Sequence, residues 1–280
     1  MRGAIQLCPQ SDKLRPAIKL AQDDVMKKLL ALIFDVDGTL ADTEREGHRV
    51  AFNRAFAQAG VDWEWSVKLY GELLRITGGK ERIRYFLEHQ GRHLARPAQL
   101  DQFIADLHAA KTNLYTNMLD EGAIPLRPGI ARLLQEARHA GIRLAIATTT
   151  TPANVTALLR NTLGAESIGW FDVIASGDIV PKKKPAPDIY TYTLEQLQLD
   201  PNACLAFEDS SNGIRSATGA GVRTLITIND YTAEEDFTEA ALVLDQLGEP
   251  GNPYRILGGH SASRVKENGW VDIAMLRTLI

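Results

Sequence analysis

Cysteine is scarce in this sequence, and long apolar runs are missing. Only Cys8 and Cys204 occur among 280 residues, and neither belongs to a CxxC pair or to a Cys/His cluster with zinc-ligand spacing. We therefore expect reduced thiols, as in a cytoplasmic protein. No apolar stretch approaches the ~20 residues that span a bilayer, so the sequence predicts no membrane partner.

A surplus of one charge is also missing. Lys and Arg number 31 against 35 Asp and Glu, which gives a formal net charge of −4. Without a basic field we expect no nucleic-acid partner. An anionic substrate would need a local basic site instead. We expect a monomer that acts on a small molecule.

The first 25 residues lack a clear hydrophobic period and the apolar core of a secretory signal. Their acidic residues argue against a transit peptide, and Met26 directly precedes the first apolar run. We expect residues 1–25 to be a disordered extension or to precede the natural start.

The remaining chain predicts an α/β fold. Residues 29–36 form an apolar run, continuous up to Asp35 and typical of a strand buried on both faces. Helical patterns dominate from 43 to about 119, and after 125 helices alternate with strands, expected at 142–147, 171–175, 203–207, 222–228 and 242–244. This order predicts a doubly wound, mostly parallel sheet. The core would comprise 26–42 and 120–280, with 43–119 inserted as an α-helical cap.

Polar clusters follow the predicted strands or lie in the loops between them. Ligands of open parallel sheets gather at the carboxyl ends of the strands. We therefore expect one site to contain Asp35 with Asp37, Thr148, Lys184, and Glu208 with Asp209.

The pair Asp35 and Asp37 can divide the work of phosphoryl transfer. In an extended strand residues two positions apart face the same side, so the chain must bend here if the two carboxylates are to have different positions, which Gly38 permits. One carboxylate can attack phosphorus and form an aspartyl phosphate. The other can protonate the leaving alkoxide and later deprotonate water. The alternative is a strand-end turn with solvated aspartates.

The other clusters suit the charges of such a reaction. Glu208 and Asp209 would repel each other unless a cation lies between them, and oxygen ligands suit Mg²⁺. Asp209 could instead cap the helix expected at Asn212. The Thr148 hydroxyl could hold phosphate oxygens, Thr149 could reach the substrate, and Lys184 could neutralise the transferring group.

Together these residues resemble the four motifs of the haloacid dehalogenase superfamily, in order: Asp35-Val36-Asp37-Gly38-Thr39-Leu40, Thr148, Lys184-Pro185 and Glu208-Asp209. The inserted helices resemble the small helical cap of that superfamily. Within it the chain resembles the CbbY group, through Asp42-Thr43-Glu44, Gly47-His48-Arg49, Ala51-Phe52-Asn53, residues 78–83 and residues 183–190. The resemblance covers about Met26 to the C-terminus.

The resemblance implies a Mg²⁺-dependent phosphatase with Asp35 as nucleophile and Asp37 as acid and base. It implies Mg²⁺ bound by the Asp35 carboxylate, the Asp37 backbone carbonyl and the Asp209 carboxylate, with Glu208 in support. Thr148 and Lys184 would bind the transferring group. The group's substrate is xylulose 1,5-bisphosphate, a by-product and inhibitor of Rubisco, so the resemblance implies a setting in the Calvin cycle.

A bisphosphate carries a second phosphate, which the cap would have to bind. Lys80 lies at an expected helix start, where charge and free N–H groups combine, and Arg82 could help. Glu44 and His48 follow the first motif, where the cap would overhang the site, and we expect them to contact the substrate. Trp63 and Trp65 are expected to pack inside the cap.

Two other functions share parts of this pattern. A sugar-phosphate mutase of the β-phosphoglucomutase kind would use the same nucleophile, metal and cap, but return the phosphoryl group to a sugar. A phospho-accepting signalling receiver also combines acidic residues, Thr and Lys on a parallel sheet. Receivers typically lack the Asp-x-Asp-Gly-Thr turn and a large helical insertion.

Overall fold

A seven-stranded sheet lies at the centre of the computed structural model, which describes residues 28–76, 79–91, 99–266 and 269–280. The expectation for residues 1–25 lies outside this range. The strand order is β3-β2-β1-β4-β5-β6-β7, and all neighbours are parallel except β6 and β7. The strands are β1 (Ala31–Phe34), β2 (Arg143–Ala147), β3 (Phe171–Ala175), β4 (Cys204–Glu208), β5 (Arg223–Thr227), β6 (Leu242–Leu244) and β7 (Ile256–Gly258). The predicted α/β class is confirmed.

Helices cover both faces of the sheet because the strands are apolar on both faces. Leu32 and Phe34 of β1 join one buried cluster, whereas Ala31 and Ile33 join another. The first cluster includes residues of α6 (Ile130–His139), α7 (Pro152–Leu163) and α10 (Ile273–Leu276), and the second includes residues of α8 (Asp188–Leu197) and α9 (Ser211–Gly219). This is the layering of a doubly wound sheet.

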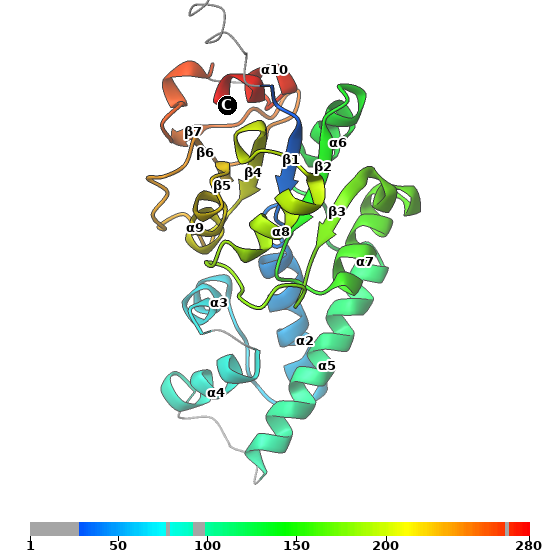
Figure 1. Ribbon diagram of the computed structural model, residues 1–280. Coiled ribbons are helices and arrows are strands. Elements are labelled where there is room, and N and C mark those ends of the chain that lie inside the picture. Colours follow the sequence, from blue (N-terminus) through cyan, green and yellow to red (C-terminus); the bar gives the residue numbers. More distant parts are fainter. Residues whose placement is uncertain (1–27, 77–78, 92–98, 267–268) are drawn as a thin grey trace, which may run out of the picture.

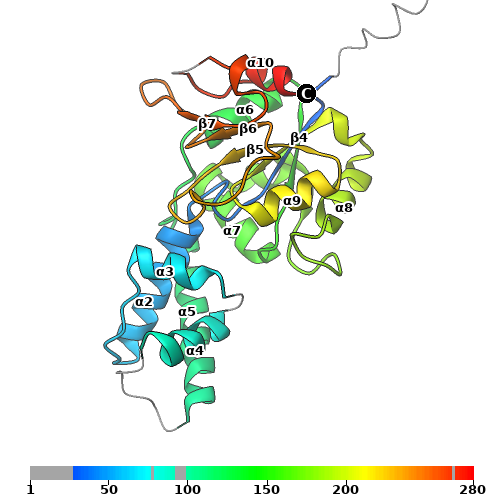
Figure 2. The same ribbon diagram turned by 90° about the vertical axis from the view of Figure 1, so that its left-hand side faces the viewer.

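A block of helices between β1 and β2 forms the cap. It contains the π-helix η1 (Thr43–His48), α2 (Arg49–Gln58), α3 (Val67–Leu74), α4 (Gly79–His89) and α5 (Leu100–Asp120). Figures 1 and 2 show it extending from the edge of the sheet at which β1 ends. The cap has its own aromatic core, in which Trp63 and Trp65 are buried, as expected.

Several elements differ from the sequence-based prediction. Helix α5 continues to Asp120, one residue beyond the predicted end of the cap at 119, because Tyr115, Met118 and Leu119 are buried on one side of it. Strand β7 and helix α10 were not predicted. Each is short, and β7 exposes Leu257, so neither leaves a clear hydrophobic period. Within the described residues, no helix has the length and apolar character needed to cross a membrane.

Candidate active site

The first motif turns sharply at the carboxyl end of β1. Asp35 follows β1 and is 7% exposed. The carbonyl of Val36 then accepts hydrogen bonds from the N–H groups of residues 39–41, and Gly38 has φ +81°. Such a φ favours glycine. The turn carries Asp37 out of the strand direction, and its Oδ1 accepts a hydrogen bond from the Thr43 hydroxyl at 2.6 Å.

Asp37 has the acidity that an acid–base group needs. Burial raises the pKa of Asp37, and the negative charge of Asp35 raises it further. The hydrogen bond from Thr43 acts in the opposite direction, and the resulting pKa is about 7. A carboxyl group with a pKa near 7 can be protonated before the reaction and deprotonated after it. The structure therefore gives Asp35 and Asp37 different environments.

Lys184 joins the first motif to the last. Its Nζ lies 2.7 Å from Asp35 Oδ1 and 2.5 Å from Glu208 Oε1, and its side chain is 8% exposed. Burial lowers the pKa of Lys184, but the attraction of Asp35 and Glu208 outweighs burial and raises it overall. Lys184 is thus a fixed positive charge beside the predicted nucleophile. The Tyr190 hydroxyl also donates to Glu208 Oε1, at 2.6 Å.

Three buried carboxylates come together at this site. Asp35, Glu208 and Asp209 each offer an oxygen, and these oxygens lie within 4.8 Å of one another. Burial raises the pKa of Glu208 to about 7, and burial together with the charge of Asp35 raises that of Asp209 well above its usual value. Glu208 Oε2 is buried and has no hydrogen-bond partner within the described part of the chain. All three features fit a divalent cation held by oxygen ligands. The side chain of Asp37 is not part of this group.

A cavity of about 220 Å³ opens beside these groups. It is lined by Asp35, Asp37, Glu44, Thr149, Lys184, Glu208, Asp209, Ser210 and Asn212. Thr149 is exposed, whereas Thr148 is almost fully buried at the end of β2, where its hydroxyl accepts a 3.3 Å hydrogen bond from the Thr150 N–H. The fold therefore brings the core residues predicted from sequence to one edge of the sheet.

On the cap side, Glu44 reaches the same cavity. The Tyr70 hydroxyl donates to Glu44 Oε2 at 2.7 Å, and Arg82 donates to the Tyr70 oxygen at 3.0 Å. Arg82 also donates to the backbone carbonyls of Leu73 and Ile76. Its guanidinium therefore connects the cap backbone to Glu44 through Tyr70.

Lys111 is a cap residue that the sequence did not point to. It is 8% exposed, and its Nζ donates to His48 Nδ1 at 2.9 Å. The His48 ring stacks on Tyr115 with centroids 3.9 Å apart. Burial lowers the pKa of Lys111 to about 8. Burial also lowers the pKa of His48 well below its usual value, and the positive charge of Lys111 lowers it further. His48 is therefore a neutral acceptor of the Lys111 hydrogen bond.

Further cations of the cap surround His108. Burial is the main cause that lowers the pKa of His108, and the positive charges of Lys111 and Lys80 lower it further. Lys80 lies in the first turn of α4 and is exposed. Lys80, Arg82, Lys111, His48 and His108, hereafter the cap cluster, thus combine three cations with two histidines of lowered pKa in a chain with a net negative charge.

Arg127 and Asn229 support the site and also had no signal in the sequence. Arg127 is half-buried where the chain returns from the cap, and it donates to the backbone carbonyls of residues 38, 227, 228 and 245. Asn229 Nδ2 donates to Asp209 Oδ2 at 2.6 Å. These contacts fix the turn at Gly38 and the position of Asp209.

The fold and the site define a hydrolase of phosphoric monoesters. A model of the haloacid dehalogenase-like hydrolase family matches residues 29–221, and the chain belongs to that family. It is 48% identical over 247 residues to the plasmid-encoded protein CbbY of Cupriavidus necator, covering 88% of this chain and 95% of the relative.

Solved structures agree with this assignment. CbbY from Rhodobacter sphaeroides in complex with phosphate is 49% identical with a TM-score of 0.67, and the match covers 85% of this chain and 100% of that one. A variant of the same protein in complex with xylulose 1,5-bisphosphate is 50% identical with a TM-score of 0.67, covering 84% and 98%. The chain is a family member with a small helical cap, similar to the CbbY group.

Proposed function

We propose that this phosphatase is Mg²⁺-dependent and acts on a sugar bisphosphate, specifically xylulose 1,5-bisphosphate. The observation that carries the proposal is the cap cluster, which provides positive charge at a second place besides Lys184. A substrate with two phosphates would use both regions, whereas a monophosphate would use one. The similarity to a protein that binds xylulose 1,5-bisphosphate supports the same substrate.

The reaction begins with Asp35. Its carboxylate oxygen attacks phosphorus, and the bond from phosphorus to the sugar oxygen breaks. Asp37, protonated because its pKa is raised to about 7, gives its proton to the departing sugar oxygen. The products of this step are the free alcohol and an aspartyl phosphate on Asp35.

The second step releases phosphate. Asp37, now ionised, takes a proton from water while the water oxygen attacks phosphorus, and the bond to the Asp35 oxygen breaks. Lys184 lies against Asp35 and offsets negative charge in both steps. Thr148 and Thr149 lie at the end of β2 and would contribute hydrogen bonds to the phosphoryl oxygens.

The carboxylates Asp35 and Asp209 would hold Mg²⁺, with the backbone carbonyl of Asp37 as a further ligand and Glu208 in support. When bound, the ion offsets the negative charge of the phosphoryl oxygens and of the nearby carboxylates.

The cap residues would choose the substrate. Glu44 lines the cavity and can accept hydrogen bonds from sugar hydroxyls, with Arg82 holding it in place through Tyr70. Lys80 and Lys111 would bind the phosphate that is not transferred, and His48 would keep Lys111 in place. Binding energy from this remote phosphate can close the cap and orient the reacting group.

A screen of phosphorylated sugars tests the proposal. It should include xylulose 1,5-bisphosphate, ribulose 1,5-bisphosphate and glucose phosphates, with release of inorganic phosphate as the readout. We expect the highest kcat/KM for xylulose 1,5-bisphosphate. A clear preference for a monophosphate would contradict the assignment, and conversion of a sugar phosphate to its isomer would instead indicate a mutase.

A further inference from the structure

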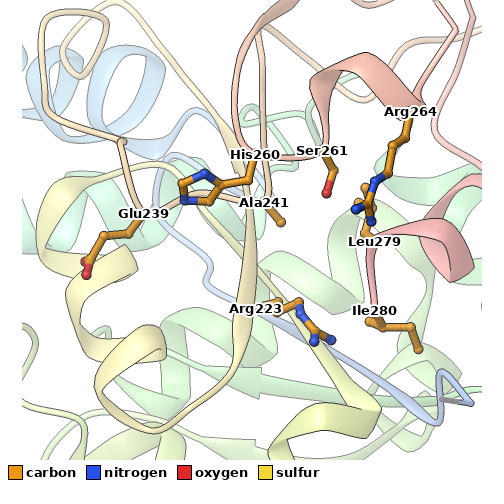
Figure 3. Close-up of a pocket in the computed structure, with 8 residues that line it drawn as sticks. All are labelled: Arg223, Glu239, Ala241, His260, Ser261, Arg264, Leu279 and Ile280. Atoms are coloured by element: carbon orange, nitrogen blue, oxygen red, sulfur yellow. The ribbon is translucent and has the colours of Figure 1, made fainter. Parts of the chain in front are cut away.

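A second cavity, of about 200 Å³, lies outside the site described above. Its walls come from the start of β5, the segment before β6, the chain after β7 and the C-terminal residues (Figure 3). Arg223 is the first residue of β5, which runs parallel to β4 and so to β1. Asp35 follows the last residue of β1. The cavity therefore lies at the edge of the sheet opposite to the active site.

Arg223 has a donor without a partner among the residues that the structure describes. Its Nη1 is buried and without a hydrogen-bond partner. Arg143 occupies the first position of β2 and donates to the Asp172 carboxylate and to the backbone carbonyl of Leu197. Among the residues that the structure describes, no carboxylate forms an ion pair with Arg223. Buried polar groups without partners are rare and costly. The positive charge of Arg223 has no acidic partner among the described residues, and the part of its guanidinium that lines the cavity can take an anion.

The other charged groups of the cavity are consistent with an anion there. In Figure 3, Arg223 and Arg264 both extend toward Leu279 and Ile280, whereas the carboxylate of Glu239 extends in the opposite direction. Glu239 also accepts a 3.4 Å hydrogen bond from the Thr218 hydroxyl. The two guanidinium groups therefore lie on the same side of the cavity, away from the Glu239 carboxylate.

Two polar side chains can add hydrogen bonds. His260 and Ser261 line the same cavity. Their backbone N–H groups donate to the carbonyls of Ala240 and Ala241, at 3.0 and 2.8 Å. These backbone bonds fix the segment next to β6. In Figure 3 the Ser261 side chain lies beside Arg264, whereas the His260 ring extends toward the side of Glu239.

We propose that this cavity binds a phosphate group between Arg223 and Arg264. Guanidinium groups match the geometry of phosphate with paired N–H donors. The volume is below the ~300–1,000 Å³ typical of drug-sized ligands, so the site suits a small anion. Free inorganic phosphate and the end of a phosphate ester share this chemistry. The site is separate from the proposed active site and does not depend on its substrate.

Amide NMR spectra recorded during a titration with inorganic phosphate test this proposal. We expect saturable shifts at the amides of His260 and Ser261 in the full chain. The active site has its own reporters in Thr149 and Ser210, so phosphate bound there is observed separately. Sodium chloride at equal ionic strength controls for general salt effects.

Substitutions assign the site. Arg223→Gln and Arg264→Gln should each weaken the phosphate response of His260 and Ser261 by about tenfold or more. Arg160→Gln, an exposed arginine of α7, should leave it unchanged. Intact spectra and an unchanged response at Thr149 would show that the variants are folded. A response of His260 that is not saturable, equals that of chloride, or persists in Arg223→Gln would overturn the proposal.

The source of the phosphate group can be separated in the same experiment. Methylphosphonate resembles the end of a phosphate ester but resists hydrolysis at its P–C bond. Saturable shifts with both compounds would support a site that also takes esters. Shifts with inorganic phosphate alone would support a site for the free ion, which is the product of the proposed reaction.

Discussion

Gly213 of α9 lies directly against the carboxylate of Glu208. A Cβ added to Gly213 would be 1.8 Å from Glu208 Oε2, far inside van der Waals contact. Glu208 cannot move away freely, because its other oxygen is held by Lys184 and Tyr190. Glycine at position 213 therefore leaves the space that the Glu208 carboxylate occupies.

Gly213→Ala should consequently reduce both kcat and stability. Alanine normally stabilises a helix by about 1 kcal/mol relative to glycine, so a loss of stability would point to the clash with Glu208. We expect a loss of about 1–3 kcal/mol, as for overpacked sites, measured by urea denaturation. Gly169→Ala is the control, because an added Cβ there meets nothing within 4 Å. Gain of stability without loss of kcat would contradict the role of Gly213.

Lys111→Met should stabilise the protein at neutral pH. Burial lowers the pKa of Lys111 from 10.5 to about 8, so the unfolded chain binds this proton more tightly than the folded one. Below pH 8 the charged Lys111 therefore lowers the free energy of unfolding by about 3 kcal/mol. This destabilisation disappears as pH rises from 8 to 10.5. The stability advantage of Lys111→Met should therefore shrink over this window.

Free energies of unfolding at several pH values check this expectation. Lys68→Met is the matched control, because Lys68 is an exposed lysine of α3 in the same cap. An advantage that does not depend on pH would show that the charge of Lys111 is not its cause.

Lys80→Ala and Lys111→Met should each impair bisphosphate turnover more than turnover of para-nitrophenyl phosphate. A charge-assisted hydrogen bond contributes roughly 1.5–3 kcal/mol, which corresponds to about ten- to a hundredfold in kcat/KM. A substrate without a second phosphate does not make the contact. The measurement is kcat/KM for both substrates, with Lys68→Ala as control. Equal losses on both substrates would assign these lysines to the fold or to the core site.

Removal of divalent metal should stop turnover. We expect EDTA to abolish activity, Mg²⁺ to restore it, and Ca²⁺ to support it poorly, because Ca²⁺ prefers longer and looser coordination than the ~2.0–2.1 Å octahedron of Mg²⁺. Mg²⁺ should also raise the melting temperature of the wild type but not of Asp209→Ala. Full activity in metal-free buffer would show that the carboxylates serve another purpose.

The sequence allows the fold and the core of the site to be predicted for a physical reason. Strands buried on both faces leave continuous apolar runs, as before Asp35 and before Glu208. The rule that strand ends meet at one edge then brings their carboxylates together. The roles assigned to these residues remain predictions, but their proximity follows from local patterns.

Lys111 shows where such patterns stop being informative. A lysine in the middle of a helix has the same local sequence whether it faces solvent or a buried histidine. Its position depends on the packing of α5 against η1 and α2, which brings His48 and Lys111 together across 63 positions of sequence. Arg127 is similar, because the four carbonyls that it binds come from distant segments.

Transfer of the phosphoryl group to Asp35 can be observed by trapping the aspartyl phosphate. In Asp37→Asn both steps should slow, typically ~10²–10⁴-fold for lost acid–base help. The variant is mixed with substrate and Mg²⁺, quenched in acid, digested and analysed by mass spectrometry. We predict a phosphoryl group on the peptide that contains Asp35, and none in the Asp35→Asn, Asp37→Asn double variant. A phosphoryl group on another residue, or turnover by Asp35→Asn at the wild-type rate with deamidation excluded, would show that Asp35 is not the nucleophile.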